Sequence, residues 1–216
     1  MPAIAILGGQ WGDEGKGKVV DYLAQRAHTV ARFSGGSNAG HTVINQYGEF
    51  RMHLVPSGIF YPHITCLIGN GVVVAPRVLL EEVDLLQGRG VDSSRLFLSD
   101  RAHLVMPYHI LLDGLEEEAR GARALGTTRR GIGPCYVDKA ARLGIRAGEL
   151  LDREAFRKRL AFVLEQKMPS SPWSMAGSPF PWRGSSMSIA PTGSACVPSS
   201  GIRDSFWRRS WSGGNG

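Results

Sequence analysis

The segment "GGQWGDEGKGKVVDYL", Gly8–Leu23, begins with a turn of glycines, two lysines and the two carboxylates of Asp13 and Glu14, which lies between an apolar run and an amphipathic stretch. A strand, a glycine-rich turn and a helix can form a phosphate site, because the helix start presents N–H groups and glycines let the backbone approach closely. Gly12, Gly17 and Lys18 fit the P-loop spacing G-x-x-x-x-G-K. Residue 19 is valine rather than the Ser or Thr that binds Mg²⁺ in that motif, so another oxygen must replace the hydroxyl. Asp13 lies inside the loop and could be a Mg²⁺ ligand, a general base or both.

Two further glycine-rich segments carry polar groups that suit an anionic ligand. The segment "FSGGSNAGHTV", 33–43, is expected to be a loop after a strand, and His41 in it could donate to an oxygen that develops charge. Loops at the carboxyl ends of parallel strands form the ligand crevice, so we expect this loop to open beside the first one. The segment "ALGTTRRGIGPCYVDKAARLG", 124–144, is either a basic surface loop or a loop that closes on an anion.

Short apolar runs alternate with helical periodicity up to about Lys167. We expect strands at Ala3–Leu7, Thr29–Phe33, His53–Val55, Thr65–Ile68 and Leu96–Leu98. We expect helices at Gly17–Ala27, Pro76–Gln87, Tyr108–Arg120 and Asp152–Gln166. This alternation predicts an α/β fold, a P-loop-like and mostly parallel sheet with flanking helices.

Composition and charge limit the classes of partner. The net charge of +6 divides equally between the first 167 residues and the remaining 49, so the larger part is near neutral and we expect no nucleic-acid partner. Three cysteines without metal-ligand spacing indicate reduced thiols. We expect no signal peptide and no membrane span, and therefore a cytoplasmic protein.

Residues 168–216 differ in composition from the rest of the chain. They hold 13 Ser, 6 Pro and 7 Gly, and four of the five tryptophans. Such a segment buries too little surface to offset its ordering entropy, so we expect disorder. Ser, Pro, Arg, Trp and Gly together are typical of GC-rich DNA translated in a wrong frame. A frameshift is therefore one hypothesis, and a genuine variable tail is the other. The sequence predicts two parts, 1–167 and 168–216.

Five motifs occur in one order along the first part: "QWGDEGKGK", "NAGHT", "HLVPSGI", "IGNGVV" and "GTTRRGIGP…YVDKAAR". From Ile4 to about Gln166 the chain resembles the adenylosuccinate synthetase family. The resemblance implies a ligase of AMP synthesis that joins IMP and L-aspartate with GTP as co-substrate and Mg²⁺ as cofactor. A base removes the proton from ring nitrogen 1 of IMP, and the 6-oxygen takes the γ-phosphate of GTP. The aspartate amine then displaces phosphate from carbon 6.

The resemblance also implies the site residues by matching position. Asp13 would be the general base, and His41 the acid that stabilises the transferring phosphoryl group. Asp13 and the carbonyl of Gly40 would bind Mg²⁺. The GTP contacts would be Gly12, Asp13, Glu14, Gly15, Lys16, Gly17, Lys18, Gly40, His41 and Thr42. The IMP contacts would be Asp13, Glu14, Gly15, Lys16, Asn38, Ala39, Gly40, His41, Thr128 and Arg142. Arg142 is an arginine that the family supplies to the neighbouring subunit, which implies a homodimer.

The chain departs from the family in two ways. Arg129 stands where the family has glycine. Family members are about twice as long, and the segments that complete the IMP site, bind aspartate and select guanine have no match here. We therefore expect a reading frame lost near codon 167, an unpaired apolar sheet edge, and poor stability or aggregation.

Three functional hypotheses follow from the sequence. The favoured one is an adenylosuccinate synthetase altered by truncation or by a sequencing error. The second is a catalytically inactive nucleotide-binding fragment that uses Lys16 and Lys18 for phosphates. The third is an interaction protein whose tail contacts nucleic acid through Arg and Trp.

Overall fold

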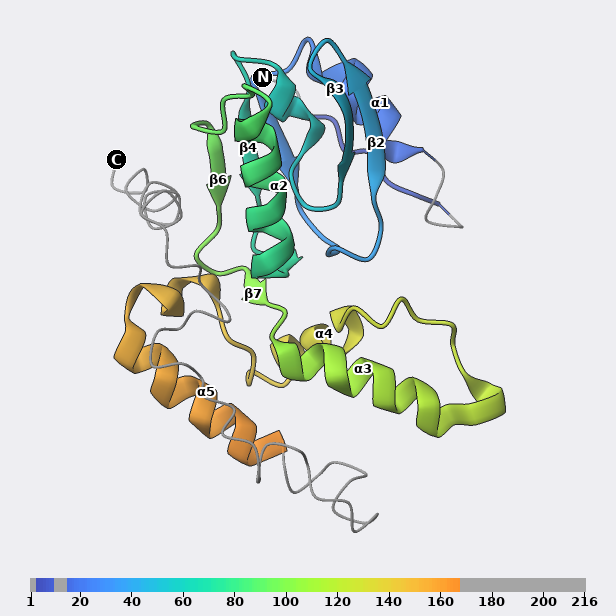
Figure 1. Cartoon of the computed structure of the whole chain (residues 1–216), viewed down its shortest axis with the longest axis vertical. Coiled ribbons are helices and arrows are strands. Elements are labelled where there is room, and N and C mark those ends of the chain that lie inside the picture. Colours follow the sequence, from blue (N-terminus) through green and yellow to red (C-terminus); the bar gives the residue numbers. More distant parts are fainter. Residues whose placement is uncertain (1–2, 10–14, 168–216) are drawn as a thin grey trace.

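The structure is a computed structural model of the chain, and it describes residues 3–9 and 15–167. The predictions made for residues 168–216, and those for Gly12, Asp13 and Glu14, lie outside the described residues. Figure 1 shows helix α2 lying along the strands, with α3 and α5 beyond their far end.

A three-stranded parallel sheet forms the centre of the fold. Its strands lie in the order β1 (Thr29–Arg32), β4 (Thr65–Ile68) and β6 (Leu96–Leu98). The sequence predicted β4 and β6 with these bounds and β1 one residue longer. Helix α2 (Pro76–Gly88) follows β4 and turns its apolar side chains toward this sheet, as the alternation of strands and helices predicts.

An antiparallel hairpin lies beside the first helix. It consists of β2 (His41–Asn45) and β3 (Gly48–Met52), and β2 contacts α1 (Lys16–Ala24). The prediction of a loop over 33–43 was therefore wrong at its end, because a strand begins at His41. Val43 pairs with Phe50 across the hairpin and both are buried, which gives this polar segment enough apolar contact to form strands.

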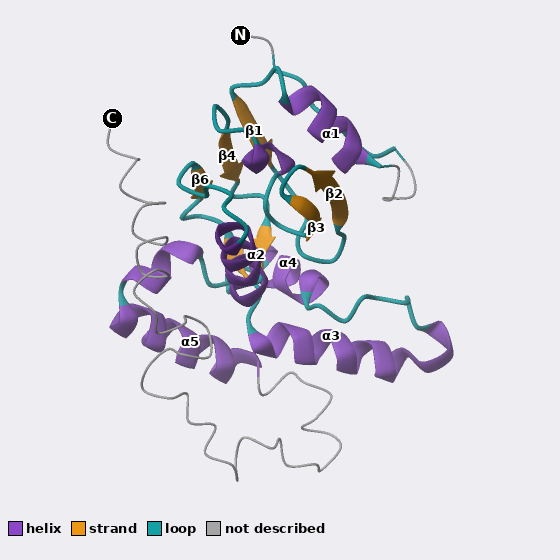
Figure 2. Cartoon of the chain, turned by 45° about the horizontal axis from the view of Figure 1, so that its top comes forward, coloured by secondary structure: helices purple, strands orange, loops and turns teal. Residues whose placement is uncertain are grey.

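The remaining elements extend the fold at one end. β5 (Val73–Val74) pairs in parallel with β7 (His103–Leu104). Three helices follow: α3 (Pro107–Arg120), α4 (Ile132–Ala140) and α5 (Arg153–Lys167). Short 3₁₀ helices in the described part of the chain lie at Gly121–Arg123 and Ala147–Leu151, and another, Ser57–Phe60, lies against α1, β1 and β4. Figure 2 shows α3 and α5 at the end of the molecule opposite α1.

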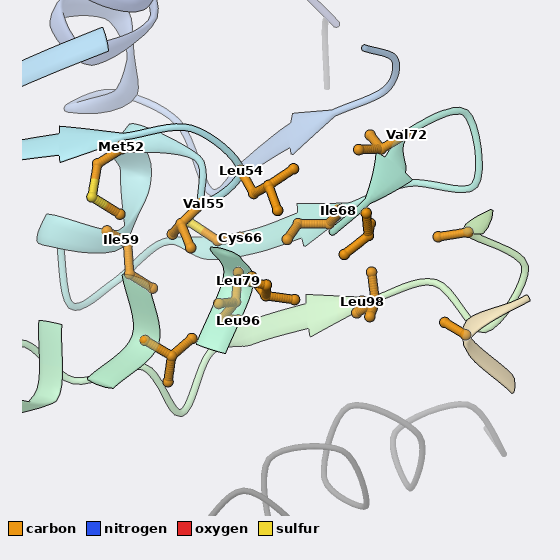
Figure 3. Close-up of a cluster of buried hydrophobic side chains, with 14 of the residues drawn as sticks. Met52, Leu54, Val55, Ile59, Cys66, Ile68, Val72, Leu79, Leu96 and Leu98 are labelled. Atoms are coloured by element: carbon orange, nitrogen blue, oxygen red, sulfur yellow. The ribbon is translucent and has the colours of Figure 1, made fainter. Parts of the chain in front are cut away.

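The main hydrophobic core lies between the parallel sheet, α2 and the segment that follows the hairpin. Figure 3 shows side chains from these three regions pointing toward one another. The labelled members are Met52, Leu54, Val55, Ile59, Cys66, Ile68, Val72, Leu79, Leu96 and Leu98. Most of this core was predictable, because the apolar runs of the strands and the periodicity of α2 supply it.

The strand predicted at Ala3–Leu7 does not form. Residues 3–9 run as a loop, with Ile4 73% and Leu7 70% exposed. A strand needs a neighbour for its backbone hydrogen bonds, and residues 3–9 pair with no strand in the part of the chain that the structure describes. The apolar run therefore lacks the partner that its composition requires.

The strand predicted at His53–Val55 was also wrong, for a different reason. The backbone N–H groups of these residues donate to the carboxylate of Glu82 on α2 instead of to a neighbouring strand. The segment is a bend, and its apolar side chains Leu54 and Val55 enter the core from it.

A buried carboxylate joins the three C-terminal helices. Asp138 of α4 accepts a hydrogen bond from His109 Nε2 of α3 at 3.0 Å, and both side chains are fully buried. The Met106 N–H donates to His109 Nδ1, so the ring proton is on Nε2 and the imidazole is neutral. Burial lowers the pKa of His109, which also favours the neutral imidazole. Lys167 at the end of α5 donates to the second Asp138 oxygen.

Two expectations drawn from composition also concern the described residues. Cys66 and Cys135 are free and buried, and burial raises the pKa of each thiol to about 12, as expected for unreactive reduced thiols. Within residues 3–9 and 15–167, every helix is too short or too polar to cross a bilayer.

Leu79→Ala should test the core. Leu79 is fully buried on α2, so the substitution should lower the free energy of unfolding by about 2–5 kcal/mol, through lost burial and a cavity. Leu85 lies on the same helix and is 38% exposed, so Leu85→Ala should cost about 1 kcal/mol or less. Urea denaturation of both variants measures the difference. Equal losses would contradict this packing.

His103→Gln should change the acid sensitivity of the fold. Burial lowers the pKa of His103 to about 4, and the nearby charges of Lys139 and Arg146 act in the same direction. An unfolded histidine binds its proton near pH 6.5, so protonation favours the unfolded chain. The stability due to neutral His103 should be complete above about pH 6.5 and decline as the pH falls toward 4.

The free energy of unfolding of His103→Gln should therefore fall less steeply over that pH range than that of the unmodified chain. His63→Gln is the control, because His63 is exposed. Urea titrations at several pH values measure the slopes. A His103→Gln slope equal to that of the unmodified chain would show that this imidazole does not titrate as described.

Candidate functional site

The first turn of α1 combines a glycine N-cap with two lysines. Gly15 is the N-cap with φ 82°, a left-handed conformation that glycine adopts at little cost. Lys16, Gly17 and Lys18 follow, and the first turn carries no acidic side chain. A helix start has partial positive charge, and two cations there add to it, so the place attracts an anion. The charge distribution therefore indicates an anion site.

This helix start lies directly against the start of β2. A Cβ atom added at Gly17 would be 2.7 Å from His41 Cβ and 2.8 Å from His41 Cγ. Real Cβ atoms do not approach that closely, so only glycine at this position lets α1 meet the hairpin as it does. Two motifs that are more than 20 residues apart in the sequence are thereby brought together.

The environment of His41 favours a neutral imidazole that donates a hydrogen bond. Its Nε2 atom is buried and has no hydrogen-bond partner among the described residues. Burial lowers the pKa of His41, and Arg32 and His53 lower it further, whereas Asp21 raises it. A buried polar atom without a partner is unfavourable in a native fold, so this nitrogen marks a place where a ligand atom can bind.

A groove with a volume of about 310 Å³ opens between α1 and β2. Its walls come from the two elements that meet at Gly17 and His41. It is lined by Gly17, Lys18, Asp21, Tyr22, Gln25, Thr42, Val43 and Ile44. Three of the predicted nucleotide contacts, Gly17, Lys18 and Thr42, therefore share one depression.

The loop 33–40 is bound to the third glycine-rich segment. The Tyr136 hydroxyl of α4 lies 2.9 Å from the Gly35 nitrogen, which donates to it, and 2.9 Å from the Gly71 carbonyl oxygen, which accepts from it. Arg130 donates to the carbonyl oxygen of Ser37. The loop that carries Asn38–Gly40 therefore has a defined place relative to α4.

The loop 124–131 is fixed by two carboxylates of α3. Asp113 Oδ2 accepts a hydrogen bond of 2.8 Å from the Gly131 N–H, and Glu117 Oε1 accepts from the N–H groups of Gly126 and Thr127. Burial raises the pKa of Glu117, but these donors outweigh it and hold the pKa below its usual value. Both ends of the loop are thus anchored to one helix.

Two arginines in this region adopt a backbone conformation that favours glycine. Arg129 has φ 53° and Arg142 has φ 61°. Arg129 stands where the family resemblance predicts glycine, and the left-handed conformation costs a non-glycine residue about 1–2 kcal/mol. Its guanidinium pairs with Glu118 at 3.2 Å, so the turn itself is retained with arginine.

The structure gathers one group of the predicted site residues and leaves two residues apart. Gly15–Lys18 and Asn38–Thr42 surround the contact between α1 and β2. Thr128 and Arg142 are exposed, and no hydrogen bond or ion pair in the described part of the chain joins their side chains to that group. Asp13 and its two neighbours are outside the description.

Sequence reasoning missed the residues that hold the loops in place. Arg32 and Glu82 lie in none of the five motifs, and Tyr136 lies in the last of them, but its hydroxyl was given no role. For Glu82 a signal existed, because it lies on the same helical face as Leu79 and Leu86, and a carboxylate among buried apolar positions needs a specific partner.

Metal ligands can be assigned only in part. Within residues 3–9 and 15–167, no group of three or more His, Cys, Asp or Glu side chains is placed to hold a metal ion. Of the two predicted Mg²⁺ ligands, Gly40 lies in the loop before β2, and Asp13 is outside the described residues.

Known proteins match most of the chain. The family model described as adenylosuccinate synthetase matches residues 5–173. The adenylosuccinate synthetase of Dehalococcoides mccartyi is 68% identical over 167 residues, which cover 77% of this chain and 40% of that protein. The adenylosuccinate synthetase of Moorella thermoacetica is 63% identical over 164 residues, which cover 76% of this chain and 38% of that protein.

A solved structure supports the same assignment and the α/β fold. The fully ligated adenylosuccinate synthetase from Plasmodium falciparum superimposes with a TM-score of 0.68 at 39% identity, over 76% of this chain and 38% of that one. The chain thus spans about 40% of the length of the curated relatives that it matches. By the matched range and the identity over it, the chain belongs to the adenylosuccinate synthetase family.

Proposed function

We propose that this chain supplies the phosphoryl-transfer half of an adenylosuccinate synthetase, which binds the phosphates of GTP and part of IMP. The observation that carries the proposal is the meeting of α1 with β2. Lys16 and Lys18 add positive charge to a helix start, and the buried His41 Nε2 beside it has no hydrogen-bond partner within residues 3–9 and 15–167. A nucleotide phosphate would neutralise the positive charge at the helix start and accept a hydrogen bond from His41 Nε2.

The reaction proposed for the complete enzyme phosphorylates the 6-oxygen of IMP. This turns a poor leaving group on the purine into a good one. Asp13 takes the proton from ring nitrogen 1 of IMP, and the 6-oxygen of IMP then attacks the γ-phosphate of GTP. His41 donates a hydrogen bond to oxygens that gain charge in this transfer. The amine of L-aspartate afterwards displaces phosphate from carbon 6, which gives adenylosuccinate, GDP and phosphate.

The two substrates share the loops around this contact. Gly12 to Lys18, with Thr42, would hold the phosphates of GTP. Asn38 to His41 and Thr128 would contact IMP, and Arg142 would reach the IMP site of a second subunit in a homodimer. The exposure of Thr128 and Arg142 leaves both side chains available for such contacts.

The donor set fits Mg²⁺. A carboxylate from Asp13 and a main-chain carbonyl from Gly40 are the hard oxygen ligands that this ion prefers. Bound there, Mg²⁺ would neutralise phosphate charge, and Val19 in place of a hydroxyl residue explains why a carboxylate is needed.

A second candidate function is nucleotide binding without catalysis. The chain spans about 40% of the length of its curated relatives, and the proposed phosphate contacts all lie within it. A catalytically inactive nucleotide-binding fragment would keep phosphate binding and lose turnover. Isothermal titration with Mg·GTP and with IMP, together with an assay for adenylosuccinate, separates the two: binding with turnover supports the enzyme, and binding alone supports the fragment.

Lys16→Ala should weaken Mg·GTP binding about tenfold or more, because it removes a cation from the phosphate site at the start of α1. Lys158→Ala is the matched control, since Lys158 is exposed on α5 and pairs only with Glu154 in the described residues. Titration calorimetry of both variants tests this. Equal affinity of the two variants for Mg·GTP would show that the start of α1 is not part of the nucleotide site.

Asp13→Asn should separate chemistry from binding. In a chimera that continues residues 1–167 with the remaining sequence of the Dehalococcoides relative, the variant should form adenylosuccinate about 10²–10⁴ times more slowly, because the general base is lost. IMP should bind with little change, because the amide keeps the size of the carboxylate. The absorbance of adenylosuccinate and calorimetry with IMP give the two values. Near-normal turnover would exclude Asp13 as the base.

A further inference from the structure

Glu82 is a buried carboxylate whose hydrogen bonds all go to one short turn. It lies on α2 and is 5% exposed. Its oxygens accept from three successive backbone N–H groups, those of His53 at 2.5 Å, Leu54 at 3.1 Å and Val55 at 2.9 Å. The His53 Nδ1 atom lies 3.4 Å from the same carboxylate. One carboxylate thus satisfies three consecutive main-chain donors, and it thereby defines the path of the turn.

The turn that Glu82 holds supports the loop of the candidate site. A Cβ atom added at Gly40 would lie 3.2 Å from two atoms of the His53 ring and 3.3 Å from the Met52 carbonyl oxygen. Met52 is also the hairpin partner of His41. Met52 and His53, at the start of the turn that Glu82 binds, therefore form the surface against which Gly40 and His41 lie.

Arg32 connects the same turn to the other end of the loop. Its guanidinium donates to the His53 carbonyl oxygen and, at 2.7 Å, to the Gly36 carbonyl oxygen. Burial lowers the pKa of Arg32, and the negative charge of Glu82 opposes that effect. The half-buried Arg32 and the buried Glu82 carry opposite charges on the two sides of the turn, and together they bracket residues 36–41.

We propose that Glu82 is a positioning residue, which acts through the 53–55 turn and through Arg32 to hold the loop 36–41 in its ligand-binding geometry. This inference rests on the proposed function, in which that loop contacts phosphate and IMP. Glu82 itself touches no substrate. Its role is to fix a main-chain segment before the ligand arrives, which reduces the ordering cost of binding.

Glu82→Gln tests the role with little change in shape. Its amide can accept at one oxygen, but its NH₂ group faces a main-chain donor, so one N–H of the turn loses its partner. Glu81→Gln is the matched control, because Glu81 is the adjacent residue, is 59% exposed and pairs with Arg77. Arg32→Lys is the second variant, since a lysine cannot bridge two carbonyl oxygens with a planar fork.

Two measurements on the whole chain decide the outcome: hydrogen exchange followed by mass spectrometry, and the affinity for Mg·GTP. We expect Glu82→Gln and Arg32→Lys to speed exchange in residues 36–41 by about tenfold or more, with little change in β4. Both should also weaken Mg·GTP binding by about tenfold or more. Glu81→Gln should match the unmodified chain in both measurements.

Faster exchange confined to residues 53–55 would overturn the proposal, as would a uniform increase over the whole chain, because both describe a purely structural carboxylate. If Glu82→Gln fails to fold, Arg32→Lys decides by the same two measurements, and failure of both to fold also overturns the proposal. A third outcome separates the two proposals. If the unmodified chain binds no Mg·GTP, but the variants still show faster exchange in residues 36–41, the proposed function is wrong and the positioning of the loop by Glu82 is supported.

Discussion

Main-chain N–H groups that are removed from water need hydrogen-bond acceptors. In the loops of this fold, where no neighbouring strand offers a carbonyl oxygen, carboxylates on helices are those acceptors. Glu82 of α2 binds the turn 53–55, and Asp113 and Glu117 of α3 bind the loop 124–131. Each of these carboxylates is buried, so each would be costly without its donors. The irregular segments around the candidate site are therefore held by hydrogen bonds to helix side chains, although they are loops.

That arrangement explains which parts of the fold could be predicted from the sequence. β4 and β6 follow from apolar runs, and the periodicity of α2 gives the helix that covers them. His53–Val55 has the same apolar character, but its N–H groups bond to a side chain 27 to 29 residues away, and no local pattern contains that information. The run at Ala3–Leu7 failed because strand formation depends on a neighbour, which composition does not supply.

At the candidate site, too, local sequence patterns were predictable and contacts between distant residues were not. The glycine and lysine pattern at the start of α1 was visible in the sequence, and so was His41 as a candidate donor. The contact between them depends on Gly17, where the absence of a side chain lets two elements meet. α4 was missed because Gly133 and Pro134 suggest a loop, yet proline is well tolerated in a first helical turn. Tyr136, which this helix carries to the loop 33–40, was missed with it.

The order of the strands in the parallel sheet has a consequence for how the chain is made. β1, β4 and β6 lie side by side in the order in which a ribosome synthesises them. Each new strand adds to the edge left by the one before it, so the sheet can grow outward during translation without waiting for a later segment. The helix α2, made between β4 and β6, covers the growing sheet before its last strand arrives. Residues 3–9 are the exception, because they emerge first and the parallel sheet forms without them.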